Sequence, residues 1–167
     1  MFQSDDLDKL WVTAYEELSS KSQVRFTTTL TALSQAVACH KCNCFVASLV
    51  MCRGAVESML YVLQQWRKGD TWIYPLGRRS FRSLTKWAIG NGVLTKAQAA
   101  KAQEIWDRGS WGAHLEQRLS EERFKGVPQE PYRVNVDSND SYQTIKTTVE
   151  VLTAAANSAY VERRSRV

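Results

Sequence analysis

The stretch NCFVASLVMCRGAVESMLYVLQQWR, residues 43–67, decides the fold of this chain. Its large apolar residues are separated by intervals of four, three, four, three, four and three: Phe45, Leu49, Cys52, Val56, Met59, Leu63 and Trp66. That spacing places them on one side of an α-helix, as a continuous stripe over about six turns. The side away from the stripe carries Arg53 and Glu57, which are one turn apart and can form an ion pair. The sequence therefore predicts a central helix over about 43–67 that faces a hydrophobic core.

Five further amphipathic segments flank this central helix. We expect them to form helices over about 5–19, 24–38, 80–89, 95–107 and 140–162, since their apolar residues recur at helical spacing. Two of these helices carry clear signals for where they begin. Ser80 can cap one of them, and Thr95 with Gln98 forms a capping box for the other. Asn91-Gly92, between the two, is typical of a turn.

The composition agrees with a helical fold. The chain has 167 residues but only 8 Gly and 3 Pro, fewer than turn-rich β folds need. A chain of this length forms one domain by default. We expect a single all-α domain over residues 1–167, a compact bundle of about five to seven helices. Its expected parts include an N-terminal helix within about 1–20, a surface loop at 126–139 and a basic tail at 163–167.

The net charge and the first residues limit the classes of protein to which this chain can belong. Lys and Arg number 22 against 17 Asp and Glu, a net charge of +5, and the pI is about 9.1. This balance permits a polyanionic partner and does not require one. Residues 1–9 are acidic, unlike a secretory signal peptide, and no apolar run of about 18 residues is present. We therefore expect a cytoplasmic protein with no membrane partner.

The cysteines lie close together in the sequence. They are Cys39, Cys42, Cys44 and Cys52, with His40 among them. Structural zinc sites usually combine two separated pairs of ligands, and the sequence offers no second pair here. The small apolar residues on both sides favour a turn between two helices that carries buried or half-buried thiols. We expect no metal and no other cofactor; metal binding by Cys39, His40, Cys42 and Cys44 is the alternative.

The segment RGSWGAH, residues 108–114, combines an Arg, a His and two glycines that let another backbone or a ligand approach closely. Arg108 offers a planar fork of donors for phosphate, and His114 can exchange a proton near neutral pH. Such a pair suffices for RNA cleavage without a metal. The RNA's own 2′-hydroxyl attacks the adjacent phosphate, Arg stabilises the developing charge and His moves a proton. The alternative is structural: His114 packs at a helix end, and Arg108 pairs with Asp107 on the surface.

Three segments of the chain follow one another in a characteristic order. They are CFVASLVMCRGAVE (44–57), LTKWAI followed by GVL (84–94), and IWDRGSWGAH (105–114). Over about residues 30–160 this order resembles the HEPN superfamily of α-helical proteins, and it looks closest to an uncharacterised prokaryotic branch. Two positions depart from the family pattern. Gly109 follows Arg108 where a polar residue is usual, and in the register of that branch the family's Arg falls on Trp106.

The resemblance implies a metal-independent endoribonuclease that works as a homodimer. Active members of the superfamily carry an Arg followed a few residues later by a His. In this chain five residues separate Arg108 from His114, so the resemblance implies that these two are catalytic. It further implies an RNA substrate and a role as a toxin-like effector in a prokaryotic defence or toxin–antitoxin system. The expected partner is a cognate antitoxin or a protein of a defence complex.

This function assigns supporting roles to further residues. We expect Arg53, Glu57 and Ser110 to support the site or bind RNA. Other basic residues can contact phosphates, or can simply form a solvated face: Arg78, Arg79, Arg82 and Arg118.

The alternative function is a non-catalytic helical module that dimerises or docks onto a partner, as a regulatory or immunity component. Exposed aromatic residues are frequent anchors at such interfaces. The aromatic residues outside the apolar stripes are the candidates: Trp72, Trp106, Trp111 and Tyr74.

Overall fold

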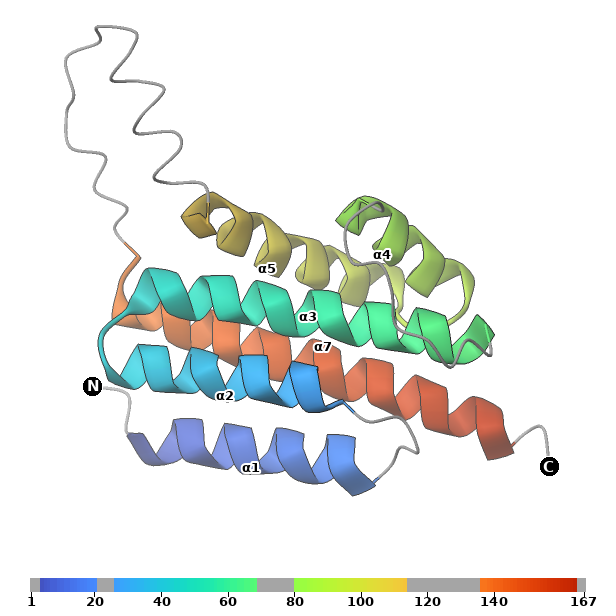
Figure 1. The fold of residues 1–167 in the computed structure, drawn as a ribbon, viewed down its shortest axis with the longest axis horizontal. Coiled ribbons are helices and arrows are strands. Elements are labelled where there is room, and N and C mark those ends of the chain that lie inside the picture. The colour runs from blue at the N-terminus through green and yellow to red at the C-terminus, as the bar shows by residue number, and fades with distance from the viewer. Residues whose placement is uncertain (1–3, 21–25, 69–79, 114–135, 165–167) are drawn as a thin grey trace, which may run out of the picture.

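The computed structural model describes residues 4–20, 26–68, 80–113 and 136–164. In these ranges the chain forms six helices and no strand: α1 (Ser4–Ser20), α2 (Thr27–Lys41), α3 (Phe45–Lys68), α4 (Phe81–Gly90), α5 (Lys96–Ala113) and α7 (Ser138–Arg164). The expected all-α bundle is confirmed (Figure 1).

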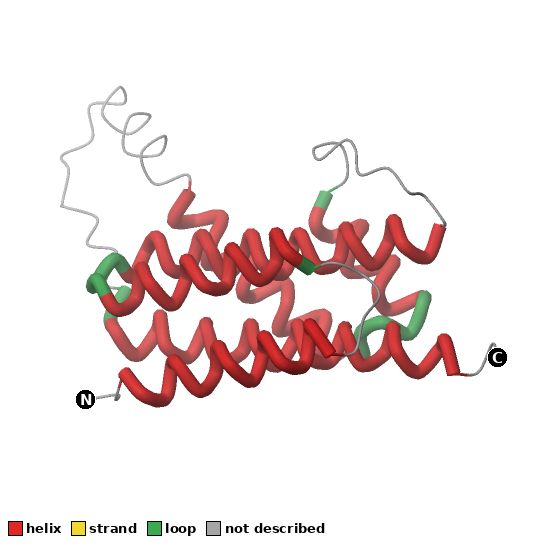
Figure 2. Tube along the Cα trace, turned by 60° about the horizontal axis from the view of Figure 1, so that its bottom comes forward, coloured by secondary structure: helices red, strands yellow, loops and turns green. Residues whose placement is uncertain are grey.

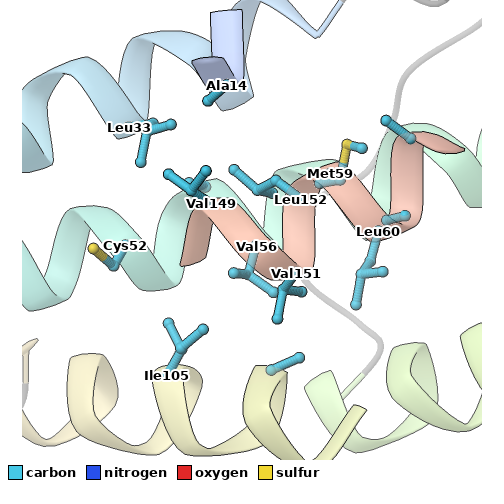
Figure 3. Packing of buried hydrophobic residues seen from close by; sticks show 14 of the residues in the cluster. Ala14, Leu33, Cys52, Val56, Met59, Leu60, Ile105, Val149, Val151 and Leu152 are labelled. Carbon is cyan, nitrogen blue, oxygen red and sulfur yellow. The ribbon is translucent and has the colours of Figure 1, made fainter. Parts of the chain in front are cut away.

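Helix α3 lies at the centre of the bundle. It packs against α2, α4, α5 and α7, while α1 packs against α2 and α7. Most of the helices run along the same long direction, as the two views in Figures 1 and 2 show. Leu33 of α2, Val56 of α3, Ile105 of α5 and Leu152 of α7 are each at most 2% exposed and come together in one core (Figure 3).

The apolar stripe of α3 is buried along most of its length. Leu49, Cys52, Val56, Met59 and Leu63 are all at most 3% exposed. The two ends of the stripe are less covered: Phe45 is half-buried and Trp66 is 36% exposed. The periodicity therefore located the core-facing side of α3 correctly and overstated its burial at both ends.

Among the described helices, only α3 is long and apolar enough to cross a membrane by length and composition. Within its residues 45–67 the most apolar 18-residue window has a mean hydropathy of 1.5, and 44% of that window is buried inside the fold. A helix with neighbours on several sides needs apolar residues on each of those sides. The contacts of α3 with four other helices account for this composition.

The predicted helix starts at α4 and α5 are confirmed in atomic detail. The hydroxyl of Ser80 accepts a hydrogen bond from the backbone N–H of Ser83 at 3.3 Å. The capping box closes in both directions: Thr95 N–H donates to Gln98 Oε1 at 2.8 Å, and Gln98 N–H donates to Thr95 Oγ1 at 3.2 Å. Gly92 in the intervening turn has a φ of +66°, a conformation that glycine adopts without strain.

Several helix boundaries differ from the predicted ones, and the start of α2 moves from 24 to Thr27. Helix α5 ends at Ala113 rather than near Asp107, because Gly109 and Gly112 continue the helix instead of breaking it. Helix α7 begins at Ser138, inside the predicted 126–139 loop, of which 126–135 lie outside the described residues. Helix α2 runs to Lys41, so Cys39 and His40 belong to its last turn. The predicted basic tail starts within α7, and its last three residues lie outside the described ranges.

Candidate functional site

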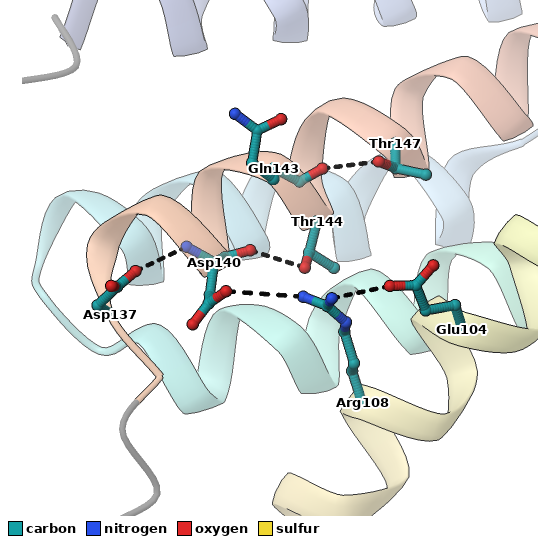
Figure 4. A network of polar contacts seen from close by, with 7 residues as sticks. All are labelled: Glu104, Arg108, Asp137, Asp140, Gln143, Thr144 and Thr147. Carbon is teal, nitrogen blue, oxygen red and sulfur yellow. Dashed lines mark hydrogen bonds and ion pairs between the residues drawn. The ribbon is translucent and has the colours of Figure 1, made fainter.

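Four segments meet at one end of the bundle: the last turns of α5, the first turns of α7, the start of α3 and the α2–α3 turn (Figure 1). Arg108 on α5 lies where they meet. Its Nη2 donates to Glu104 Oε1 at 2.8 Å, one turn earlier on the same helix. Its Nη1 lies 3.9 Å from Asp140 Oδ1 on α7 (Figure 4). The Arg108 side chain is 42% exposed, so its guanidinium bridges two helices at the surface.

Asp140 is held in place by the capping of α7. Asp137 Oδ1 accepts a hydrogen bond from the backbone N–H of Asp140 at 2.8 Å, which satisfies one of the free donors of the first turn. The Thr144 hydroxyl donates to the Asp140 carbonyl oxygen at 2.8 Å (Figure 4). A carboxylate in the first turn also interacts favourably with the helix dipole. Asp140 is therefore a fixed partner for Arg108.

The surroundings of Arg108 are acidic. Glu104 and Asp140 contact the guanidinium, Asp107 precedes it on α5, and Asp137 caps α7 beside it. The surface pair of Arg108 with Asp107 is not formed, because adjacent residues on a helix do not face each other; Asp107 Oδ1 accepts a hydrogen bond from Gln103 Nε2 at 2.9 Å. A phosphate group that approaches Arg108 therefore competes with two carboxylates for the guanidinium.

An open hollow of about 420 Å³ lies beside Arg108. It is lined by residues of α3, α5 and α7 and of the segment before α7: Leu49, Asp107, Arg108, Val136 and Asp140. A smaller space on the other side of the guanidinium is bounded by Glu104, Ile105, Gln143, Thr144 and Thr147. Both spaces leave the Arg108 side chain accessible to a ligand.

Arg53 and Glu57 lie on the side of α3 away from the apolar stripe, but both side chains are partly buried there. Helix α5 covers this side, and the Arg53 side chain is only 22% exposed. Arg53 Nε lies 3.8 Å from Glu57 Oε2, and its guanidinium lies 4.7 Å from the centre of the Trp106 ring. The Trp106 ring stacks on Phe81 with 5.4 Å between centroids and 11° between planes. Arg53 is thus packed beneath α5 by a cation–π contact and an ion pair.

Helices α3 and α5 approach each other closely at Gly109. A Cβ atom at this position would lie 2.7 Å from the Leu49 carbonyl oxygen and would collide with Arg53 Cβ. The predicted close approach at this glycine is therefore an approach of the α3 backbone. Ser110, the next residue, has a buried hydroxyl without a hydrogen-bond partner in the described structure, and the same holds for Trp106 Nε1.

The structure brings together part of the predicted site. Arg53 on α3 lies against α5 at Gly109, the residue between Arg108 and Ser110 in the sequence, and it pairs with Glu57 on its own helix. Arg82 is exposed on α4, which lies beside the other end of α5 (Figure 1). Outside the described residues lie the other predicted site residues and two predicted anchors: Arg78, Arg79, His114, Arg118, Trp72 and Tyr74. The side chain of Trp111 is also outside the description, and Trp106 is half-buried against Phe81.

The cysteine cluster lies at the expected turn between two helices, but the expected burial of its thiols is wrong for Cys42 and Cys44, which are exposed. Cys42 caps the end of α2, Cys44 directly precedes α3, and Cys52 is buried within α3. Within the described ranges no group of three His, Cys, Asp or Glu side chains is arranged to hold a metal ion.

Contacts missed by the sequence analysis complete this end of the bundle. His40 is 8% exposed, and its Nδ1 lies 2.9 Å from the Ser141 hydroxyl on α7. Lys41 binds Asp8 on α1 at 2.6 Å. The pairing of Arg108 with Glu104 could have been found from the four-residue spacing. No local signal connects His40 with Ser141, or Arg108 with Asp140, because each pair joins distant segments.

We expect the stability of the fold to fall as the pH is lowered from about 7 to 5, with His40 responsible for part of the loss. Burial lowers the pKa of His40 below its usual value of 6.5. The unfolded chain therefore binds a proton more readily than the folded one, and protonation favours unfolding. Urea unfolding at both pH values measures the effect. His40→Asn, which can keep a bond to Ser141, should reduce this pH dependence, whereas an unchanged dependence would contradict the assignment.

Comparison with known proteins adds no residue to this site. No protein-family model, curated protein or solved structure matches the chain. The functional interpretation therefore depends on the side chains described above and on the order of segments in the sequence.

Proposed function

We propose that this chain is a HEPN-like, metal-independent endoribonuclease that uses Arg108 and His114. The observation that carries the proposal is the position of Arg108, whose half-exposed guanidinium borders an open hollow near the end of α5. Helix α5 ends at Ala113, directly before His114. Arg provides the bidentate donors that a phosphate needs, and a nearby His provides a proton carrier at neutral pH.

The proposed reaction needs no external nucleophile. The 2′-hydroxyl of the RNA loses its proton and attacks the adjacent phosphorus, and the 5′-oxygen of the next nucleotide leaves with a proton. Arg108 stabilises the negative charge that develops on the phosphate oxygens, and His114 transfers a proton. The products are a 2′,3′-cyclic phosphate and a free 5′-hydroxyl.

The carboxylates around Arg108 set a condition for RNA binding. Arg108 and its two partners are exposed by 42–62% of their side-chain area. Ion pairs of this kind contribute only about 0–1 kcal/mol, so a phosphate can replace Glu104 and Asp140 at modest cost. In the absence of RNA these carboxylates hold the guanidinium between α5 and α7.

The same proposal includes the biological setting. The protein acts as a homodimer in which two sites face each other, as a toxin-like effector of a prokaryotic defence or toxin–antitoxin system. A cognate antitoxin or another protein of the defence complex restrains it. These roles follow from the resemblance to the HEPN superfamily.

Cleavage of RNA in the presence of a metal chelator tests the proposal. We expect purified protein to cleave RNA in excess EDTA, and His114→Ala to lose this activity while keeping the circular dichroism spectrum of the wild type. Equal cleavage by His114→Ala and wild type would refute the assignment of His114. Absence of cleavage by wild-type protein would favour the second candidate function.

A groove between α1 and α2 favours that second candidate, a non-catalytic module that docks onto a partner. The groove has a volume of about 590 Å³ and is lined by Trp11, Tyr15, Leu18, Phe26 and Leu30 together with polar residues of α2. Trp11 and Tyr15 lie 5.9 Å apart between ring centroids, and Tyr15 is 52% exposed. Exposed aromatic residues at a groove are typical of protein interfaces. A dimeric mass in gel filtration without RNA cleavage would support this function.

A further inference from the structure

The turn between α2 and α3 follows a precise hydrogen-bonding pattern. The N–H of Asn43 donates to the His40 carbonyl at 2.9 Å, and the N–H of Cys44 donates to the Cys39 carbonyl at 2.8 Å. Asn43 has a φ of 59°, in the left-handed region. Together these features define a Schellman motif, in which Cys39 is three residues before the C-cap Cys42 and Cys44 is two residues after it.

The motif brings Cys39 and Cys44 close to each other across the turn. In Schellman motifs the side chains at these two positions commonly contact each other across the turn. The hydrogen bond between the two residues also holds their backbones close, as a disulfide requires. In most proteins an apolar pair fills these positions, whereas here both residues are thiols.

We propose that Cys39 and Cys44 are a thiol oxidation site that forms a reversible intramolecular disulfide by exchange with a small-molecule disulfide such as oxidised glutathione. The bond closes across the α2–α3 turn and requires rotation of the two side chains. It joins the end of α2 to the start of α3 at the end of the bundle where His40 contacts Ser141. This inference is independent of the proposed ribonuclease activity.

The exposure of the thiols assigns the order of the two exchange steps. Cys44 is exposed and Cys39 is half-buried. Burial raises the pKa of Cys39, and the neighbouring Cys44 and Cys42 raise it further. The Cys44 thiolate therefore attacks glutathione disulfide first, breaking its S–S bond and releasing one glutathione thiolate, which takes up a proton. The Cys39 thiolate then attacks Cys44 Sγ and releases the second glutathione.

The other two cysteines are poorer partners. Cys52 is fully buried, and burial raises the pKa of its thiol to about 12, so it stays protonated and unreactive. Cys42 is exposed, but it is the C-cap residue and lies outside the pair that the Schellman motif brings into contact. The Cys44 thiol lies 3.6 Å from the backbone carbonyl oxygen of Cys42, so its contact with Cys42 is a contact with the backbone.

Peptide mapping tests the proposal directly, because Lys41 separates the two cysteines for trypsin. The folded full-length protein is incubated with excess oxidised glutathione, then denatured in the presence of an alkylating reagent and digested. We expect the free thiols of the denatured protein to fall from four to two. Peptide 26–41, which holds Cys39, should be linked to peptide 42–53 through Cys44. Dithiothreitol should restore both peptides.

Two matched variants decide which thiols react. Cys42→Ser should keep the link between the two peptides, and Cys44→Ser should abolish it. Circular dichroism spectra confirm that both variants are folded. A link that persists in Cys44→Ser, a bond between Cys42 and Cys44 within peptide 42–53, or glutathione adducts without any peptide link would each overturn the proposal.

Discussion

Gly109→Ala is expected to destabilise the bundle by about 3 kcal/mol, the upper range for overpacking a close contact, although alanine is the better helix former. The added methyl group would lie 2.7 Å from the Leu49 carbonyl oxygen and would collide with Arg53 Cβ. Neither atom is at the end of a flexible side chain, so α5 has to move away from α3. Urea unfolding followed by circular dichroism measures the loss.

Gly54→Ala is the matched control, since Gly54 lies within α3 and no atom comes within 4 Å of an added Cβ. This substitution should stabilise the protein by about 0.5–1 kcal/mol, the ordinary advantage of alanine within a helix. The same Gly→Ala substitution is thus expected to lower the free energy of unfolding at position 109 and to raise it at position 54. A Gly109→Ala variant as stable as Gly54→Ala would show that α3 and α5 do not touch at Gly109.

This contact explains why the sequence predicted the end of α5 incorrectly. Gly109 and Gly112 lower the helix propensity of the segment, and propensity alone favours an end near Asp107. Packing against α3 overrides this preference, since only glycine fits at the Leu49 carbonyl. The starts of α4 and α5, after Ser80 and Thr95, were predictable because the groups that cap each helix lie three residues apart in the sequence.

The candidate site was predictable only where it depends on local spacing. The stripe of α3 identified one buried side, but a central helix is covered on several sides, so Arg53, on the side away from the stripe, is packed beneath α5. Asp140 and Arg108 are 32 positions apart, and their contact depends on how α7 packs against α5. Composition and periodicity carry no information on that packing.

Arg108→Ala is expected to lower RNA cleavage by about 100-fold or more, the usual cost of removing a group that stabilises developing negative charge. Glu104→Gln and Asp140→Asn should act in the opposite direction. Each removes a carboxylate that competes with phosphate for the guanidinium, so RNA binding should become tighter. Cleavage rates and RNA affinities of the purified variants, measured at one fixed salt concentration, test both directions.

Lys101→Ala distinguishes a role of Arg108 in RNA cleavage from a purely structural role of Arg108. Lys101 also joins α5 to α7, through a 3.0 Å ion pair with Glu150, so its removal deletes one cation and one bridge between the same two helices. If Arg108 acts on RNA, Lys101→Ala keeps wild-type cleavage while Arg108→Ala loses it. If Arg108 only connects the helices, both variants keep wild-type cleavage. Both then also lose little stability, because exposed ion pairs contribute about 0–1 kcal/mol. In that case Asp140→Asn leaves RNA affinity unchanged, and the catalytic assignment of Arg108 is wrong.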